Sequence, residues 1–408
     1  MSSVAVVGGG TAGFEAAAEA SRNGAEVILL ERLDGWEPSW QVWPDLILSP
    51  EQSAGSHPLP DNVELTLGAN VTSIGRDFVL TTDGTKVRFD SVVLATGSEF
   101  VPAVFHGRRK QGVIILDGLE AYAELGRERS SMAHVVIRGE GVQAFHVADG
   151  LRGTGRKVTL LTAPWLERFA SKTIGTAVRD AAARRGVSIL DSTLRSALGC
   201  GHVEAVLAGG TVVPCDALVF LPGRVPCFPQ TLGETGPNGG LLVDQNLRSS
   251  SPLLYAAGGC AEPRYCWPHL GTLEGAAATS GRVAGANAAG HRVSMRTLNF
   301  AEASFFGLRW ARAGTRLEEA RAHGLMVSEI SRRWSPESAC SIVYERPSGR
   351  VVGVELVIEE GDQRLGVLMA INSSTSLRAV AYGVSGCSSD ISLVSDTARL
   401  GLQAWSGS

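Results

Sequence analysis

The first 31 residues constrain the fold most, because they place a glycine fingerprint between two apolar runs. Residues 4–7 predict a buried strand, and Gly8, Gly10 and Gly13 follow it in a G-x-G-x-x-G pattern. An alanine-rich helix and a second strand at residues 26–30 come next, and Glu31 stands at the end of that strand. This order predicts a β-α-β unit with an acid at its tip.

Each of these residues has a physical role in holding a dinucleotide. Gly8 permits the tight turn, Gly10 lets the backbone approach a pyrophosphate, and Gly13 lets helix and strand pack closely. The helix N-terminus favours phosphate, and Glu31 can accept hydrogen bonds from a ribose diol. A glycine-rich turn can be purely structural, but a strand, a helix and an acid in register favour dinucleotide binding.

Length and composition exclude several classes of protein. A chain of 408 residues can form two or three domains, and 44% hydrophobic residues with 49 glycines fit an α/β enzyme. The net charge of -4 is small and spread out, so no basic face for nucleic acid is expected. The sequence has neither a long apolar span nor a secretory signal pattern, so we expect a soluble, cytoplasmic protein without a membrane partner.

The seven cysteines follow neither a C-x-x-C pattern nor a zinc pattern, so we expect reduced, mostly buried thiols and no metal site. No cysteine precedes Cys200. Residues 32–60 are rich in Trp, Pro and Ser and predict an irregular excursion. Its Trp36, Trp40 and Trp43 would either cap the core or stack on an aromatic ring.

The remaining segments of the first half predict strands. Residues 63–71 and 78–89 alternate, and Asp83-Gly84 marks a hairpin turn within the second run. Residues 91–98 predict a buried strand that ends in small residues. Small side chains there would let the backbone lie beside a bound nucleotide.

A second β-α-β unit is predicted from residue 134 onward. Gly139 and Gly141 begin a G-x-G-x-x-A pattern between a strand at 134–138 and a helix, and residues 157–161 form the next strand. Its strand tip carries Thr162 in place of an acid, and Glu140 puts a carboxylate where phosphates would lie. The repeat predicts either a second nucleotide site or a decayed copy of the first.

The last third changes character. Residues 216–226 and 253–262 predict further strands and turns, and a long helix follows at about 272–289. After a linker at 290–298, the pattern is that of an α+β domain. Its predicted elements are helices at 316–323 and 393–403 and strands at 341–344, 351–358 and 365–372.

This order of pieces resembles the pyridine nucleotide-disulfide oxidoreductase flavoproteins. It is most similar to the branch of NADH oxidase, NADH peroxidase and coenzyme A disulfide reductase, with ferredoxin and rubredoxin reductases as cousins. The resemblance implies an α/β fold with two Rossmann-like domains, for FAD and NAD(P), and a C-terminal α+β dimerisation domain. The implied limits are 1–113 and 241–292 for the FAD domain, 114–240 for the NAD(P) domain and 298–408 for the interface domain.

The resemblance also implies site residues. The opening fingerprint and Glu31 would bind the ADP half of FAD, and Gly139 and Gly141 would lie where NAD(P)H binds. Residues 95–97 and 255–259 correspond to the second and third flavin motifs. The full predicted cofactor-binding set is Gly8, Gly10, Thr11, Ala12, Gly13, Glu31, Arg32, Val71, Ala95, Thr96, Gly97, Gly258, Gly259, Gly139 and Gly141.

The departures from the family pattern bear on the chemistry. Disulfide-active members carry a redox cysteine in the loop after the first acid, and residues 37–43 contain none. A thiolate is what attacks a disulfide or reacts with peroxide, so neither chemistry is expected by the family's route. Trp40 stands about where that sulfur would be. The third motif ends in Gly259 instead of Asp, which would remove one charge-assisted hydrogen bond to FAD, about 1.5–3 kcal/mol.

Other departures concern the expected nicotinamide pocket and the final domain. His146 replaces the family's helix glutamate, and Val142 stands where a residue often gates the flavin. Residues 382–390 are smaller and more polar than the family's aromatic segment. The candidate catalytic residues are Trp40, His269 as a general acid or base, and Cys387 as a nucleophile. A backbone-bonded histidine and a packed thiol are the simpler interpretations of the last two.

The resemblance and the departures predict a cysteine-independent, FAD-dependent oxidoreductase. A hydride would come from NAD(P)H or a small organic substrate and pass to oxygen, a small acceptor or a redoxin. One alternative is the same fold recruited to tailor a specialised metabolite without NAD(P)H. Another is a catalytically silent nucleotide-binding subunit. In each case we expect a homodimer.

Overall fold

A computed structural model describes residues 2–35, 58–139, 141–162, 170–264, 274–295, 300–322, 324–359, 397, 398, 400 and 403. These residues form two compact units. The first takes its described residues from Met1–Val42, Ser53–Phe100 and Arg224–Asn299. The second takes them from Val101–Gly223 and Phe300–Ser408. The four-part division into domains stays a prediction.

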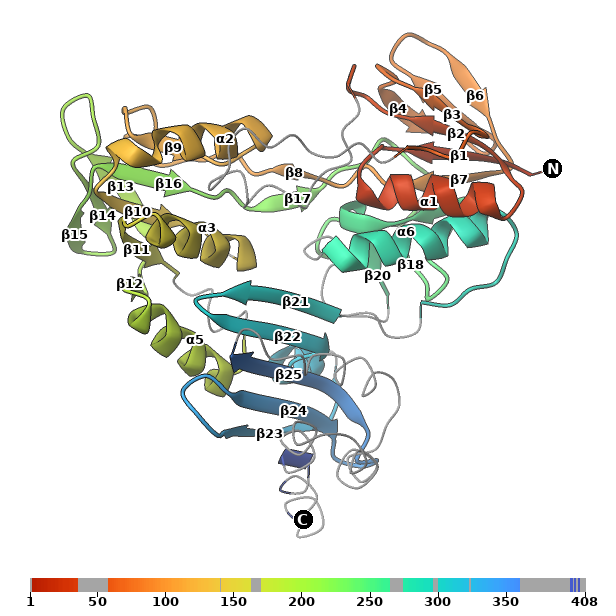
Figure 1. Ribbon diagram of the computed structural model, residues 1–408. Helices are drawn as coiled ribbons and strands as arrows, with labels where there is room; N and C mark the ends of the chain where they lie inside the picture. The colour runs from red at the N-terminus through yellow and green to blue at the C-terminus, as the bar shows by residue number, and fades with distance from the viewer. Residues whose placement is uncertain are drawn as a thin grey trace. The chain divides into compact units, whose positions relative to one another are not determined.

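A five-stranded parallel sheet forms the centre of the first unit, in the order β19-β7-β1-β2-β3 (Figure 1). This is the Rossmann order, with the first strand in the middle and the chain reversing direction beside it. The predicted α/β fold with Rossmann-like parallel sheets is therefore confirmed. The strands are β1 Ser3–Val7, β2 Glu26–Leu30, β3 Val63–Thr66, β7 Ser91–Leu94 and β19 Leu254–Ala256.

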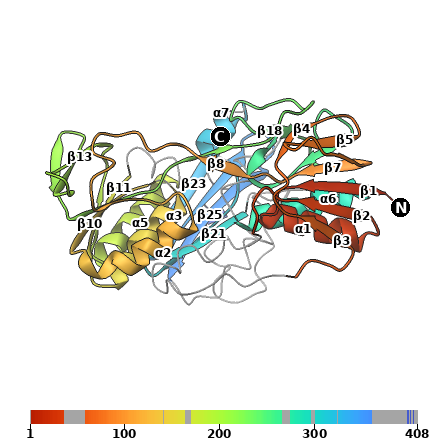
Figure 2. The same ribbon diagram turned by 90° about the horizontal axis from the view of Figure 1, so that it is seen from above.

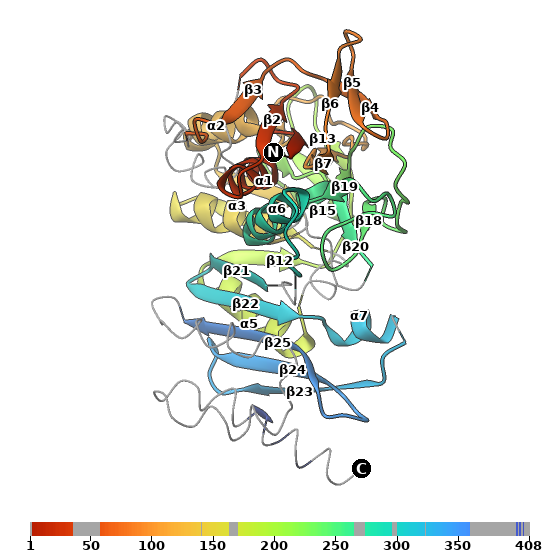
Figure 3. The same cartoon turned by 90° about the vertical axis from the view of Figure 1, so that its right-hand side faces the viewer.

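Two helices of small residues pack together in this unit. Figure 3 shows α1 (Thr11–Arg22) and α6 (Glu274–Ala288) side by side. A Cβ added at Gly281 of α6 would lie 2.3 Å from the carbonyl oxygen of Ala12, and one at Gly285 would lie 2.2 Å from that of Ala16. The glycines therefore let the helix backbones approach each other closely, which fixes α1 against its neighbour.

A small antiparallel sheet of β4 (Val71–Ile74), β5 (Phe78–Thr81) and β6 (Lys86–Arg88) follows β3. The predicted hairpin around Asp83-Gly84 is confirmed. The predicted single strand at 63–71 is wrong, because the chain leaves the parallel sheet after β3 and turns at Gly68, whose φ is +68°. The unit also contains β8 Ser98–Phe100, β17 Arg224–Pro226, β18 Leu241–Val243, the short helix η4 Gly258–Cys260 and β20 Ala261–Pro263.

The second unit has a parallel sheet in the order β12-β11-β10-β16-β9, which repeats the first four strands of the Rossmann order. Its edge strand β9 precedes β10 in the chain, whereas β19 is the last strand of the first sheet. The predicted strands at 134–138 and 157–161 are confirmed as β10 and β11. The strands are β9 Val113–Ile115, β10 His134–Arg138, β11 Lys157–Leu161, β12 Val187–Leu190 and β16 Ala217–Phe220. The helices are α2 Leu119–Glu128, η3 Arg129–Ser131, α3 Val142–Gly153 and α5 Lys172–Arg184. A three-stranded antiparallel sheet of β13 Leu194–Leu198, β14 Ala205–Ala208 and β15 Thr211–Pro214 completes the repeat.

A five-stranded antiparallel sheet follows, in the order β21-β22-β25-β24-β23. The predicted strands at 341–344 and 351–358 and the predicted helix at 316–323 are confirmed, and the predicted strand at 365–372 lies outside the described residues. The elements are β21 Phe300–Phe305, β22 Leu308–Gly314, α7 Leu317–Ala322, β23 Val327–Arg333, β24 Ala339–Glu345 and β25 Val351–Glu359.

Contacts within the second unit join this antiparallel sheet to the helices of the parallel sheet (Figure 2). Phe305 and Phe306, at the turn between β21 and β22, pack on Phe145 of α3 with ring centroids 4.7 and 5.5 Å away. On α5, the carboxylate of Asp180 pairs with Arg333 of β23 at 2.7 Å. The sheet therefore buries apolar surface against α3 and pairs charges with α5.

The close approach of α1 and α6 makes a prediction. Gly285→Ala should lower the free energy of unfolding by about 1–3 kcal/mol, because the new Cβ cannot fit beside Ala16 without a shift of the helices. Denaturant unfolding of the purified protein would measure this. The matched control is Gly153→Ala at the end of α3, where a Cβ meets nothing within 4 Å and helix propensity favours alanine. Equal losses in both variants would contradict the packing argument.

Candidate dinucleotide-binding sites

The turn after β1 is built by the close approach of backbone atoms. Gly8 has a φ of +103°, and a Cβ there would lie 2.5 Å from the carbonyl oxygen of Ala95. A Cβ at Gly13 would lie 1.8 Å from the carbonyl oxygen of Gly8. Any side chain at either position would push the helix away from the strand, so the fingerprint glycines hold the N-terminus of α1 at the carboxyl edge of the sheet.

The N-terminus of α1 has the properties of a phosphate site. Its N-cap is Gly10, no side chain among the described residues caps it, and its first turn, which begins with Thr11 and Ala12, contains no acid. The first N–H groups of a helix carry a partial positive charge. The residues present therefore fit a pyrophosphate, and the binding role of Gly10, Thr11 and Ala12 stays a prediction.

Glu31 lies at the end of β2 with its carboxylate held by the backbone. Oε2 accepts a hydrogen bond from the N–H of Gly9 at 2.6 Å, and Oε1 accepts one from the N–H of Leu33 at 2.9 Å. The side chain is buried, so its orientation is fixed before any ribose binds. The next residue, Arg32, instead points to solvent and makes an exposed ion pair with Glu99 at 3.5 Å.

The structure brings the other predicted flavin motifs to the same turn. Gly259 lies so close to Gly97 that an added Cβ would be 3.2 Å from its carbonyl carbon, and a Cβ at Gly258 would be 2.8 Å from the Ala12 side chain. A Cβ at Gly97, where φ is +71°, would meet nothing within 4 Å. Three segments far apart in the sequence therefore meet beside α1 and leave open space at Gly97.

Thr96 and Val71, two further predicted residues, have partners within the protein. The Thr96 hydroxyl donates to the carbonyl oxygen of Cys227 at 2.5 Å, which ties the second motif to the segment after β17. Val71 begins β4, where it is half-buried and packs on the core. Neither contact tests a role in cofactor binding, so both roles stay predictions.

The nearest acid after Gly259 in the sequence does not take the place of the missing aspartate. The next acid along the chain, Glu262, is buried and accepts hydrogen bonds from the backbone N–H groups of Asn238 and Gly240 at 3.1 and 3.0 Å. It also accepts one from the Asn238 side chain at 2.9 Å. This carboxylate is therefore committed to a turn of the protein itself.

The second fingerprint also places closely packed glycines between a strand and a helix, but its backbone differs from the first, where the N-cap Gly10 has a φ of -69°. Gly139 packs so closely that an added Cβ would lie 2.9 Å from the side chain of Ala144 and 3.0 Å from that of Leu221. Gly141 has a φ of +88° and is the N-cap of α3, which no described side chain caps. The second helix N-terminus therefore also fits a phosphate group, although Glu140 lies outside the described residues.

An acid that the sequence analysis did not predict lies beside the end of β11. The buried hydroxyl of Thr162 donates to Oδ1 of Asp191 at 2.9 Å, and Asp191 follows the neighbouring strand β12. Arg179 of α5 donates to the same oxygen at 2.8 Å. The sequence signal for this acid was its position directly after the third strand of the unit. The standard fingerprint expects the acid after the second strand, so its spacing does not point to Asp191.

Helix α3 carries Val142 and His146, the two residues that depart from the family pattern in the expected nicotinamide pocket. Val142 begins the helix, and the ring of His146 is 6.3 Å from the ring of Phe305, which is fully buried at the hairpin tip of β21. The histidine therefore faces the antiparallel sheet of its own unit. The candidate catalytic residues Trp40, His269 and Cys387 lie outside the described residues, and so does Cys266.

The environments of four described cysteines raise the pKa values of their thiols. Burial is the main cause at Cys227, where Glu99 adds to it and the pKa rises to about 11. Burial likewise raises the pKa to about 12 at Cys215 and at Cys340, and above the ordinary value at Cys260. These thiols stay protonated near neutral pH, and a protonated thiol is a poor nucleophile.

The described part of the chain contains neither a metal-ligand cluster nor a membrane-spanning helix. No group of three or more His, Cys, Asp or Glu side chains there is arranged to hold a metal ion. No helix within the same residues is both long and apolar enough to cross a bilayer.

Comparisons with known proteins identify related sequences. The family model described as pyridine nucleotide-disulphide oxidoreductase matches residues 2–289. Rubredoxin-NAD(+) reductase of Pseudomonas putida is 29% identical over 278 residues, which cover 64% of this chain and 72% of that protein. Mercuric reductase of Acidithiobacillus ferrooxidans is 25% identical over 314 residues, 72% of this chain and 55% of that protein.

Solved structures show the same fold over the full chain. The water-forming NADH oxidase of Lactobacillus brevis, solved bound to NADH, has a TM-score of 0.82 at 18% identity and covers 100% of this chain and 99% of its own. An NAD-dependent persulfide reductase from A. fulgidus has a TM-score of 0.81 at 19% identity, and the match covers 99% of this chain and 84% of that protein. Putidaredoxin reductase in its covalent complex with putidaredoxin has a TM-score of 0.76 at 20% identity, with 98% and 99% covered.

The buried carboxylate of the first site makes a prediction. Glu31→Ala should weaken FAD binding roughly ten- to a hundredfold, because it removes charge-assisted hydrogen bonds worth about 1.5–3 kcal/mol. Flavin fluorescence after dialysis and titration would measure the dissociation constant. The control is Glu64→Ala in β3, an exposed acid of the same sheet. An unchanged dissociation constant in Glu31→Ala would exclude the ribose role.

Proposed function

Because the chain belongs to the pyridine nucleotide-disulphide oxidoreductase family, we propose that it is an FAD-dependent oxidoreductase that works without a cysteine. The family's cofactors are FAD and NAD(P)H. In this proposal a hydride leaves NAD(P)H or a small organic substrate, and the electrons reach oxygen, a small acceptor or a redoxin. FAD, when bound, supplies the two-electron chemistry, and the protein supplies binding and orientation.

The meeting of three separate motifs beside α1 is the observation that carries this proposal. The uncapped helix N-terminus at Gly10 would hold the pyrophosphate, and the fixed carboxylate of Glu31 would hold the ribose. The open space at Gly97 leaves room for the part of the cofactor that passes the second motif. Each group is in place before binding, so little ordering is needed when the cofactor enters.

The cysteine pattern supports chemistry without a thiolate. No cysteine precedes Cys200, so the loop after Glu31 lacks the sulfur that the family's disulfide chemistry needs. Cys260 directly follows Gly259 of the third flavin motif and is fully buried. Cys227 also lies beside the flavin motifs, because its backbone bonds to Thr96 and Gly97. The elevated pKa of its thiol, about 11, argues against a role as a nucleophile near neutral pH.

Relatives support a redoxin as one electron acceptor. One relative is named rubredoxin-NAD(+) reductase, and one structural neighbour was solved in complex with putidaredoxin. We also propose that the chain forms a homodimer through residues 298–408. Light scattering of the purified protein would test the dimer independently of any activity.

The test is anaerobic reduction of the purified flavoprotein. Its flavin absorption bands should bleach on addition of NADH or NADPH, and they should do so equally in a variant with Cys227, Cys266 and Cys387 all changed to Ser. A variant that binds flavin but bleaches more than about tenfold slower would show that a thiol takes part. The control is Cys200→Ser, which changes an exposed cysteine.

Other outcomes of this test separate the alternative functions. A yellow protein that neither nucleotide bleaches would favour the tailoring enzyme that works without NAD(P)H. A colourless protein that takes up no FAD would favour the silent subunit. Either result would overturn the proposed NAD(P)H-linked function.

The missing acid of the third motif gives a further prediction. Gly259→Asp should tighten FAD binding by roughly tenfold or more, because a carboxylate would regain one charge-assisted hydrogen bond. The substitution needs neighbouring atoms to shift by a few tenths of an ångström, since the nearest atoms to the new Cβ would be 3.2–3.4 Å away, and the backbone of Gly259 is not left-handed. The dissociation constant from flavin titration measures the change. Gly259→Asn is the uncharged control, and equal affinities of both variants would contradict the charge argument.

A further inference from the structure

The second dinucleotide site differs from the first in where its acid comes from. In the first unit Glu31 ends β2, the second strand of the Rossmann order. In the second unit the matching strand, β11, is followed by Thr162, and Asp191 follows the third strand, β12. The two strands are parallel and adjacent, with Leu161 beside Leu190, so their ends meet at one edge.

Asp191 is held so that one of its oxygens remains available. Thr162 and Arg179 both donate to Oδ1, and Oδ2 accepts no hydrogen bond from any residue within the described ranges. The side chain is 55% exposed. Partial burial acts to raise the pKa of Asp191, but the hydrogen bonds and charge of Arg179 and the Thr162 hydroxyl outweigh it, so the pKa is lowered. The carboxylate is therefore ionised at neutral pH.

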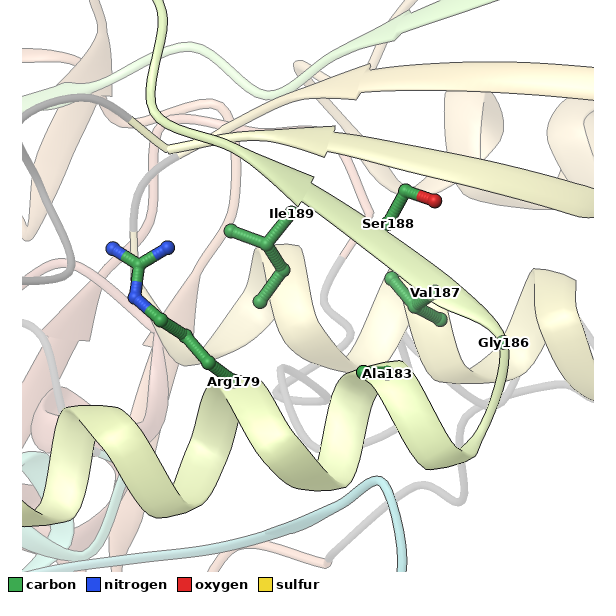
Figure 4. A pocket seen from close by; sticks show the side chains of 6 residues that line it. All are labelled: Arg179, Ala183, Gly186, Val187, Ser188 and Ile189. Atoms are coloured by element: carbon green, nitrogen blue, oxygen red, sulfur yellow. The ribbon is translucent and has the colours of Figure 1, made fainter.

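Arg179 reaches the carboxyl end of β12 from helix α5. Figure 4 shows its side chain extending past Ile189, with Ser188 and Val187 further back along the strand. These residues line a groove of about 430 Å³ between α5 and β12. Because Arg179 is paired with Asp191 at 2.8 Å, its charge is already balanced. It is therefore not set up to attract a second anion.

We propose that Asp191 is the ribose-binding acid of the second dinucleotide site and that it makes this site prefer NADH to NADPH. This inference rests on the proposed function, because it assumes that the second site binds a nicotinamide dinucleotide. Oδ2 would accept a hydrogen bond from the 2′-hydroxyl of the adenosine ribose, the contact that an acid makes in sites for NAD. A 2′-phosphate at that place would meet the carboxylate and be repelled.

Thr162 and Arg179 act as positioning residues in this arrangement. Thr162 is buried, so its hydroxyl can anchor the carboxylate in one orientation. Arg179 balances the charge and fixes the same oxygen. If Asp191 lost its charge, Arg179 would be released at the strand tip, where an arginine favours a 2′-phosphate.

The test measures binding of the oxidised nucleotides, so that turnover plays no part. Calorimetric titration of the FAD-loaded protein with NAD⁺ and with NADP⁺ gives the ratio of the two dissociation constants. The unaltered protein should bind NAD⁺ at least about tenfold more tightly. Asp191→Asn should weaken NAD⁺ binding about tenfold and strengthen NADP⁺ binding several-fold. Asp77→Asn, which breaks the exposed pair with Arg88 at 3.2 Å, should change neither constant.

A second variant keeps the test decisive if Asp191→Asn does not fold. Arg179→Ala leaves the carboxylate in place and removes the compensating charge, so the preference for NAD⁺ should persist or increase. A preference that moves toward NADP⁺ in Arg179→Ala would overturn the inference. So would a ratio that Asp191→Asn leaves unchanged.

The outcomes also separate this inference from the proposed function. If both nucleotides bind but the ratio does not respond to Asp191, the inference fails and the NAD(P)H-linked function stands. If the FAD-loaded protein binds neither nucleotide, the NAD(P)H-linked function fails and the inference fails with it.

Discussion

The structure depends most on the close approach of backbone atoms around α1. Gly13 rests against the carbonyl oxygen of Gly8, and Gly8 rests against that of Ala95. On the opposite side, Gly281 of α6 rests against the carbonyl oxygen of Ala12. The absence of side chains at these points sets the position of the helix to within a fraction of an ångström, since interiors are packed too tightly to tolerate an added carbon. The helix N-terminus that would hold the pyrophosphate is positioned by this packing.

The two parallel sheets show which parts of such a site are fixed by folding and which are free to change. Both share the order of four strands, a glycine turn and an antiparallel sheet of three strands. The glycines recur because the fold needs them whether or not a nucleotide binds. The acid can come from more than one strand, because the ends of neighbouring parallel strands meet at one edge. Glu31 follows β2 in the first unit, and in our proposal Asp191, which follows β12, takes this role in the second. The absence of an acid after the second strand is therefore weak evidence that a dinucleotide site has been lost.

Local pattern was enough to predict most of the parallel strands, their glycine turns and the approximate limits of α6, because each rests on neighbouring residues, but it did not predict β9 or β12. Long-range packing was not predictable. Phe306 has a φ of +57°, an unfavourable conformation for an aromatic residue, and it is held by Phe145 and by a hydrogen bond from its N–H to Asp149 at 2.8 Å. Helix α5 was likewise missed, although its serine N-cap, Ser171, is a standard start signal. The contact between Asp191 and Thr162 depends on the register of β11 and β12, which the spacing of residues in the sequence does not determine.

The antiparallel sheet also influences the second site, through α5. The N–H of Ser171, at the start of this helix, donates to the buried carboxylate of Glu355 in β25 at 2.8 Å, and the same carboxylate accepts from the Trp310 indole at 2.8 Å. Burial raises the pKa of Glu355, and the nearby charge of Arg312 opposes that rise. An acceptor at a helix N-terminus stabilises it, and here it also sets where the helix begins. Arg179 lies two turns further along α5, so its reach to Asp191 depends on an anchor in a different sheet. A substitution in β25 could therefore alter nucleotide preference without touching the nucleotide.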